Sequence, residues 1–124
     1  MALTFILVIS NLVNMEIQEG HILYSDIEQL ALQSRKAAAL LRAMANEQRL
    51  LILCHLAAAN ELGVGALGER MSLSQSALSQ HLAKLREDGI VAYRREAQSL
   101  YYHIADDNAA RVLTLLRDLF CPQL

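Results

Sequence analysis

The stretch SLSQSALSQHLAKLREDGI, residues 72–90, has the spacing of an amphipathic helix with an unusual outer face. Leu78, Leu82 and Leu85 recur at helical intervals, so they form one apolar stripe along such a helix. A surface helix usually carries Lys or Glu opposite this stripe. The opposite face here carries mainly hydroxyl and amide side chains, namely Ser76, Ser79 and Gln80, with Ala83 beside them. The sequence therefore predicts a helix whose exposed face allows another molecule to approach closely.

Capping residues mark both ends of this helix. Ser74 is the expected N-cap, because its hydroxyl can accept a hydrogen bond from the first turn. Leu73 and Leu78 occupy the two positions of a hydrophobic staple. Gly89 is placed to end the helix, since glycine readily adopts the positive φ that follows a last turn. We therefore predict a helix over residues 75–88.

The neighbouring segments indicate a DNA-binding fold. A short helix is expected near residues 64–71, before a tight turn that leads into the helix just described. Two runs rich in β-formers, IVAYRR (90–95) and LYYHI (100–104), then flank the polar turn EAQS (96–99). Leu100, Tyr102 and Ile104 are expected to face inward, and Tyr101 and His103 outward. The order short helix, turn, helix and hairpin is typical of a winged helix-turn-helix.

Three further helices complete a mainly α fold with a β-hairpin wing. Each follows a residue suited to N-capping: residues 26–43 after Ser25, 47–59 after Asn46, and 107–120 after Asp106. The helix at 47–59 is apolar nearly all round, which predicts that it is central and buried. The segment NELGVG (60–65) reads as a connector with two glycine breakers.

Composition and charge restrict the classes of function. The chain has 124 residues, of which 54% are hydrophobic and 19% charged, so we expect one small globular domain. Its net charge is −2, but residues 70–103 hold five basic and three acidic residues. A mildly basic segment in an acidic chain fits a local anionic partner. The chain lacks a nucleophile elbow, a phosphate loop and a paired-carboxylate signature, so we expect no enzyme.

The first 24 residues are treated as an N-terminal apolar extension, separate from a domain at 25–124. The apolar run over residues 1–13 is too short to span a bilayer, and no membrane partner is expected. It also lacks the basic region and cleavage site of a signal peptide. Another reading is that translation begins at Met15 and residues 1–14 belong to an over-long gene model. The two cysteines form no disulfide framework, so a cytoplasmic location is the default.

Operator DNA is the partner that explains the hydroxyl and amide face. In a winged helix-turn-helix the second helix lies in the major groove, where Ser and Gln donate and accept at base edges. The residues expected to reach base edges are Ser76, Ser79, Gln80 and His81, with Ser74 and Gln75 nearer the phosphates. Arg94 and Arg95 on the hairpin are expected to grip the backbone, or one enters the minor groove. The alternative is a polar helix in a small helical domain.

The sequence resembles the ArsR/SmtB family of bacterial winged-helix repressors over residues 40–121. Three motifs carry the resemblance: LLRAMANEQRLLILCHL (40–56), LSQSALSQHLAKLREDGIV (73–91) and RREAQSLYYHI (94–104). It implies a homodimer formed through the first and last helices, which binds double-stranded operator DNA, an inverted repeat, and leaves it when an inducer is sensed. The wide apolar stripes of those helices agree with dimerisation. Alternatively, the stripes complete the core of a monomer.

The resemblance does not extend to the metal sites of the family. Metal sensors carry ELCVCDL at the start of the short helix, whereas this chain has glycine at both thiol positions in ELGVGAL (61–67). The last helix contains no His, and the four histidines are dispersed along the chain. We therefore expect no metal and no cofactor, although ligands gathered across a dimer remain an open alternative.

The placement of Cys54 and Cys121 resembles the HlyU/BigR-like subgroup of this family, in which two thiols respond to reactive sulfur or an oxidant. The resemblance implies that linking these cysteines releases the protein from DNA, so that reactive sulfur species or an oxidant act as inducer. Cys121, near the chain end, is the expected accessible thiol, and Cys54 the resolving one. The alternative is a DNA-binding regulator with inert cysteines, which fill the core, and which is constitutive or controlled by an unidentified ligand or metal.

Overall fold

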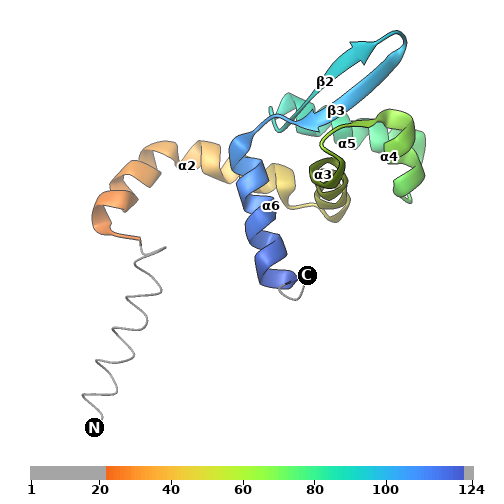
Figure 1. Ribbon diagram of the computed structural model, residues 1–124. Helices are drawn as coiled ribbons and strands as arrows, with labels where there is room; N and C mark the ends of the chain where they lie inside the picture. Colours follow the sequence, from red (N-terminus) through yellow and green to blue (C-terminus); the bar gives the residue numbers. More distant parts are fainter. Residues whose placement is uncertain (1–21, 122–124) are drawn as a thin grey trace. The chain divides into compact units, whose positions relative to one another are not determined.

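The computed structural model describes residues 22–121, which form five helices and one small antiparallel sheet (Figure 1). The chain divides into two compact units, residues 1–35 and 36–124. The second unit contains the sheet and all of the helices that surround it. The expectations for the apolar run and for Met15 lie outside the described residues.

The first described helix, α2 (Tyr24–Met44), begins earlier than the sequence predicts. Ser25 was expected to cap it, but Ser25 lies inside the first turn. Asp26 provides the cap instead, because its carboxylate accepts a hydrogen bond of 2.9 Å from the backbone N–H of Leu23. The acidic side chain also lies at the positive end of the helix dipole.

Helix α3 (Glu47–Ala59) has the predicted bounds and the predicted cap. The Asn46 side chain accepts hydrogen bonds from the backbone N–H groups of Gln48 and Arg49, at 3.0 and 3.1 Å. The expectation of burial all round is wrong for this helix. Its neighbours α4, α5, α6, β1 and β3 cover only part of its surface, so Leu51 stays 45% exposed and Cys54 is exposed too.

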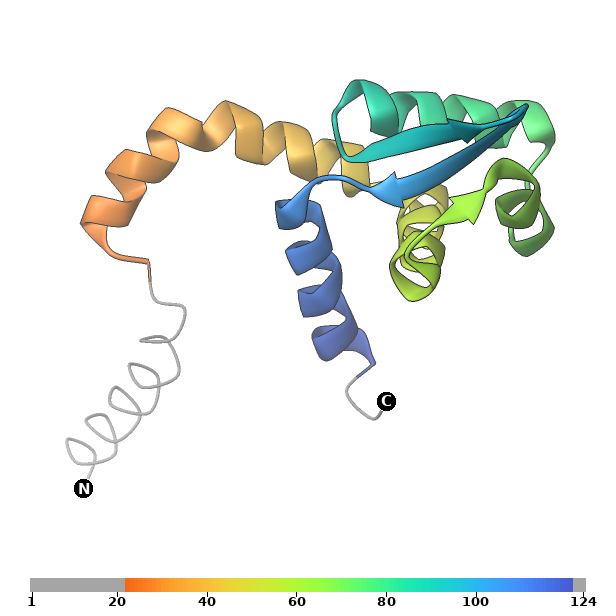
Figure 2. The same cartoon turned by 45° about the horizontal axis from the view of Figure 1, so that its top comes forward.

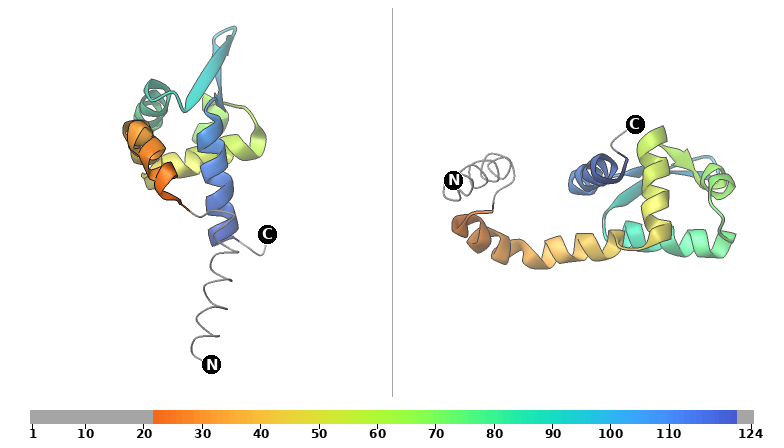
Figure 3. Two further views of the ribbon diagram at one scale, coloured as in Figure 1. Left: turned by 90° about the vertical axis from the view of Figure 1, so that its left-hand side faces the viewer. Right: turned by 90° about the horizontal axis from the view of Figure 1, so that it is seen from below.

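The helix pair α4 (Val64–Arg70) and α5 (Gln75–Glu87) confirms the predicted helix-turn-helix. The Ser74 hydroxyl caps α5 by accepting a hydrogen bond of 3.1 Å from the backbone N–H of Ala77. Gly89 follows the helix with a φ of +76°, a conformation that favours glycine. In Figure 3 the axis of α5 crosses that of α3, and both helices contribute buried leucines to the core.

The sheet contains β1 (Leu62–Gly63), β2 (Val91–Glu96) and β3 (Ser99–Ile104), in the order β1-β3-β2. The turn between β2 and β3 has two residues rather than the predicted four, because Glu96 pairs with Ser99 and extends the ladder. Ala97 in that turn has a φ of +54°. The sequence did not predict β1, which lies beside β3 in Figure 2.

The core lies between α3, α5 and the sheet. Tyr102 is buried, and Leu100 and Ile104 pack against the core, so the predicted inward face of β3 is confirmed. The largest fully buried side chains are Ile52, Leu53, Leu56, Leu67, Leu78, Leu82, Leu85, Ile90 and Val91. This core fixes α5 and the hairpin to one scaffold, so their relative positions are set within the domain.

The last helix, α6 (Asp107–Phe120), uses only part of its apolar stripe within one chain. Asp106 caps it as predicted, accepting a hydrogen bond of 2.8 Å from the backbone N–H of Asn108. Leu113 is buried, whereas Leu119 and Phe120 are 63% and 77% exposed. The exposed part of the stripe is an apolar surface that no other residue in the range 22–121 covers.

Candidate nucleic-acid interface

The outer face of α5 is exposed as the sequence predicts. Leu78, Leu82 and Leu85 are buried on its inner face and anchor the helix to the core. On the outer face, Gln75, Ser76, Ser79 and Gln80 are exposed, and His81 is half-buried. The structure thus brings together the predicted base-reading side chains on one helix, and their contact with DNA stays a prediction.

The start of α5 is arranged to receive an anion. The Ser74 hydroxyl is already used by the N–H of Ala77, and it lies 3.4 Å from the Ser76 hydroxyl. The N–H groups at the first positions of a helix have no acceptor within the helix and lie at the positive end of its dipole. A phosphate oxygen placed there would find donors from both backbone and hydroxyl groups.

The start of α5 and the tip of the hairpin border the same groove. This groove has a volume of about 810 Å³, and Gln75 lies on its helical side. Gln98 and Ser99, at the hairpin turn, line its other side. The start of α5 and the hairpin therefore belong to one continuous surface. A DNA duplex on this surface would contact both elements.

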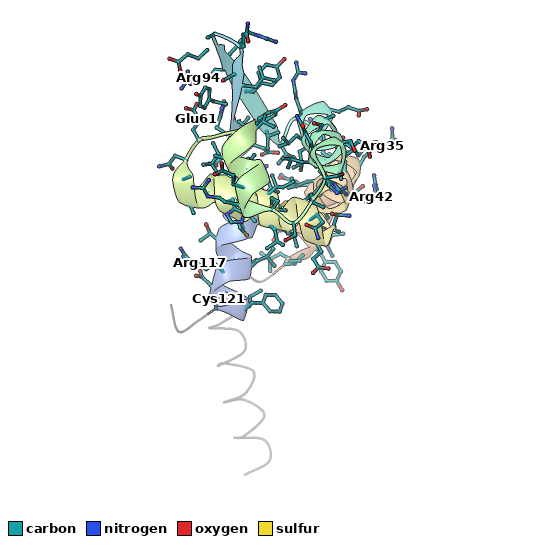
Figure 4. The ribbon with its side chains drawn as sticks, turned by 90° about the vertical axis from the view of Figure 1, so that its right-hand side faces the viewer. Arg35, Arg42, Glu61, Arg94, Arg117 and Cys121 are labelled. Atoms are coloured by element: carbon teal, nitrogen blue, oxygen red, sulfur yellow. The ribbon has the colours of Figure 1, made fainter. Side chains whose placement is uncertain are left out.

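The two hairpin arginines have different surroundings. Arg94 donates to both carboxylate oxygens of Glu61, each at 2.9 Å, and to Glu96 at 2.8 Å. Figure 4 shows Glu61 beside Arg94 at the hairpin. Arg95 takes part in no ion pair among residues 22–121. Of the two, Arg95 is the one whose guanidinium is available to a phosphate.

The ion pair changes the titration of both partners. The hydrogen bonds from Arg94 are the main cause that lowers the pKa of Glu61 below its ordinary value. The same hydrogen bonds, with those to Glu96, raise the pKa of Arg94, which is charged in any case. Sequence reasoning missed Glu61, because the two residues are 33 positions apart and no local pattern pairs them.

A second cation, Arg86 near the end of α5, is held against an aromatic ring. The Arg86 guanidinium lies 4.4 Å from the centre of the Tyr93 ring, which ties the end of α5 to β2. Lys84 forms an ion pair of 3.5 Å with Asp88, one helical turn further on. The ion pair between Lys84 and Asp88 offsets one of the positive charges near the end of α5.

The two cysteines belong to contacting parts of the fold, α3 and the end of α6. Both are free and exposed, with Cys54 on α3 and Cys121 directly after α6, whose end Figure 4 labels. Although the Cys54 side chain reaches solvent, its partial desolvation by neighbouring groups is the main cause that raises the pKa of the thiol, and Cys121 raises this pKa further. Cys54 also lines a cavity of about 550 Å³ between α3 and α6, together with Thr114 and Arg117.

The described residues offer no site for a metal ion. No three His, Cys, Asp or Glu side chains of residues 22–121 are placed to hold one. His55, His81 and His103 lie on α3, α5 and β3. Within the same range, no helix is long and apolar enough to cross a membrane.

Comparison with known proteins identifies the family. Residues 46–93 match the sequence profile described as "Bacterial regulatory protein, arsR family". The transcriptional activator HlyU of Vibrio cholerae is 50% identical over 77% of this chain and 88% of its own. The solved structure of reduced HlyU from Vibrio cholerae has a TM-score of 0.70 at 51% identity, covering 76% of this chain and 98% of its own.

A repressor structure has the same fold. The transcriptional repressor BigR from Xylella fastidiosa has a TM-score of 0.71 at 33% identity, covering 77% of this chain and 97% of its own. These relatives are transcriptional regulators, which confirms that the chain is no enzyme. The winged-helix fold is confirmed by the same structures. The chain belongs to the arsR family of bacterial regulatory proteins and is a DNA-binding transcriptional regulator.

Proposed function

We propose that this regulator is a homodimeric repressor, which leaves its operator when Cys54 and Cys121 become linked. The observation that carries the proposal is the placement of two free, exposed thiols, one on α3 and one directly after α6, which contacts α3. The likeness to a repressor structure supports repression as the direction of control.

The operator is read by α5. The exposed hydroxyls and amides reach base edges in the major groove, while Ser74 and Gln75 stay near the phosphates. Arg95 contacts the DNA backbone from the hairpin. A symmetric dimer would place two copies of α5 about one helical turn of DNA apart, so the operator is an inverted repeat.

The dimer forms through the first and last helices. On α6, Leu115, Leu119 and Phe120 are between 55% and 77% exposed, and on α2 Leu32 and Leu41 are 83% and 56% exposed. Apolar surfaces of this kind usually mark an interaction with a partner. A second copy of the chain covers them and sets the distance between the two reading helices.

The switch is a two-electron oxidation of the dithiol. The Cys121 thiolate attacks the outer sulfur of a persulfide, R–S–SH, and the thiolate RS⁻ leaves. The Cys54 thiolate then attacks the Cys121 sulfur, so that a disulfide forms and hydrosulfide leaves. In sum, two thiols lose two electrons and two protons, and the persulfide is reduced to RSH and H₂S. A longer sulfur bridge, built from a polysulfide, relaxes the geometric limits of a direct disulfide.

Mass spectrometry combined with a gel shift tests this function. After treatment with polysulfide, peptide mapping should find Cys54 and Cys121 linked within one chain, and the operator complex should disappear. Reduction with a dithiol should restore both the free cysteines and the complex. Treated protein that carries the link and still binds operator, or that loses DNA without any link, would contradict the proposal.

A regulator with inert cysteines is the second candidate. The raised pKa of Cys54 favours it, because a thiol that stays protonated at neutral pH is a poor nucleophile. Such a protein would bind operator equally with and without polysulfide or peroxide, and would be constitutive or respond to another ligand. The same gel shift therefore separates the two candidates.

A further inference from the structure

The hairpin is joined to the rest of the domain by an ion pair between distant parts of the sequence. Arg94 lies on β2, and Glu61 lies directly before β1. The Nε of Arg94 donates to one carboxylate oxygen of Glu61 and its Nη2 donates to the other, both at 2.9 Å. This two-point contact fixes the orientation of the guanidinium as well as its distance.

Other groups hold Arg94 in the same place. Its third donor, Nη1, reaches Glu96 at 2.8 Å, and its guanidinium lies 4.7 Å from the centre of the Tyr101 ring. That ring lies over Gly63, where an added Cβ would come within 3.3 Å of it. Arg94 on β2 therefore contacts both Tyr101 on β3 and Glu61, the residue that precedes β1.

In this arrangement Nε, Nη1 and Nη2 of Arg94 already donate to carboxylates, so few donors remain for a DNA phosphate. Two carboxylates surround one guanidinium, so the local charge is negative despite the arginine. A phosphate would have to displace Glu61 or Glu96 while it approached their negative charge. Arg95, the next residue on β2, has no such competitor among residues 22–121.

We propose that Glu61 and Arg94 form a clamp that positions the hairpin on DNA, and that Arg95 rather than Arg94 contacts the phosphate. Both residues of the clamp act as positioning residues. The inference rests on the proposed contact between hairpin and DNA. It implies that Glu61 increases the affinity for DNA. A negative charge near DNA would by itself decrease that affinity.

The sign of the effect at Glu61 gives the first test. Removing a negative charge near DNA should strengthen binding, unless that charge holds a cation in place. Glu61→Gln should instead weaken operator binding about two- to fivefold, which is the range for a partly exposed ion pair. The matched control is Glu69→Gln, an exposed glutamate on α4, which should leave binding unchanged or strengthen it. Thermal melting should verify that both variants are folded.

The salt dependence of binding gives the second test. Arg94→Ala should weaken binding without changing the slope of log K against log salt, because no phosphate contact is lost. Arg95→Ala should lower the magnitude of that slope by about one unit. The double variant Glu61→Arg with Arg94→Glu reverses the pair and should recover part of the lost affinity.

The outcomes separate this inference from the proposed function. A slope reduced by Arg94→Ala, tighter binding by Glu61→Gln, or no recovery in the reversed pair would overturn the clamp. An unchanged slope in Arg95→Ala would overturn the phosphate contact and with it that half of the inference. Release of DNA by polysulfide is measured separately and depends on neither result.

Discussion

Gln80 lies on the exposed face of α5, where the sequence predicts a side chain that contacts DNA bases. Its amide lies on the outer face of α5, while the leucines of the same helix are buried beneath it. A Gln side chain can donate and accept at once, which suits a base edge better than a phosphate. The position of Gln80 was predictable, because helical spacing alone decides which residues share a face.

Replacing Gln80 should affect one DNA sequence more than others. Gln80→Ala should cost on the order of 1–3 kcal/mol of binding free energy for the cognate operator and much less for random DNA. Fluorescence anisotropy on both duplexes at one salt concentration measures the difference. Equal losses on the two DNAs would mean that Gln80 does not read sequence.

The reactivity of Cys54 should depend on pH differently in the folded protein and in an unfolded peptide. Because burial and Cys121 raise the pKa of Cys54, its reactive thiolate forms only at higher pH than in an unfolded chain. In the Cys121→Ser variant, burial still acts, so Cys54 should react with iodoacetamide more slowly near neutral pH than in a peptide of residues 47–59. The rate should rise toward alkaline pH. Identical profiles for protein and peptide would contradict the assigned environment.

Helices whose ends depend on local chemistry were predictable in this chain. Asn46, Ser74 and Asp106 were expected as caps, and each accepts a backbone hydrogen bond at its helix start. Such bonds join residues two or three positions apart, so the local sequence contains both partners. The prediction of Ser25 as a cap was wrong because the helix begins at Tyr24, and the Asp26 carboxylate accepts from the N–H of Leu23, the residue before the helix.

Elements that depend on distant partners were not predictable. Strand β1 has two residues, which is too short for any alternation, and it exists because it pairs with β3 some 40 positions later. The clamp of Glu61 and Arg94 is non-local in the same way. The exposure of Cys54 was missed for a related reason, since an apolar helix surface does not show which neighbours cover it.

The cap at Asn46 should support the stability of α3. Its side chain accepts hydrogen bonds from two backbone N–H groups, which the helix itself cannot satisfy. Asn46→Ala should lower the free energy of unfolding by about 1 kcal/mol, as measured by denaturant titration followed by circular dichroism. Asn46→Asp keeps an acceptor at this position and should unfold close to the parent. A loss as large in the aspartate variant would show that capping is not the cause.

In the whole molecule, the proposed dimer depends on the apolar surface that residues 22–121 leave exposed on α6. Leu119 and Phe120 are exposed at the end of α6, and burying side chains of this size contributes about 1.5–3 kcal/mol each. Leu119→Glu should therefore shift the protein from dimer to monomer in analytical ultracentrifugation, while Leu119→Met should leave the dimer intact. A glutamate variant that remains dimeric would place the interface elsewhere.

Linking the cysteines should change this assembly rather than the reading surface itself. A link between Cys54 and Cys121 would join α3, which belongs to the core, to the end of α6, which carries the exposed stripe. Pulling the end of α6 against α3 would alter the angle between two copies of α5 in a dimer. A hundredfold loss of operator affinity corresponds to about 2.7 kcal/mol, which such a change must supply.

Operator release in the two cysteine variants tests the switch most directly. Anisotropy of labelled operator would be followed while polysulfide is added to the parent, to Cys54→Ser and to Cys121→Ser. All three proteins should bind operator when reduced, and only the parent should release it. Release from either single-cysteine variant, at the polysulfide concentration that acts on the parent, would contradict a switch made of Cys54 and Cys121.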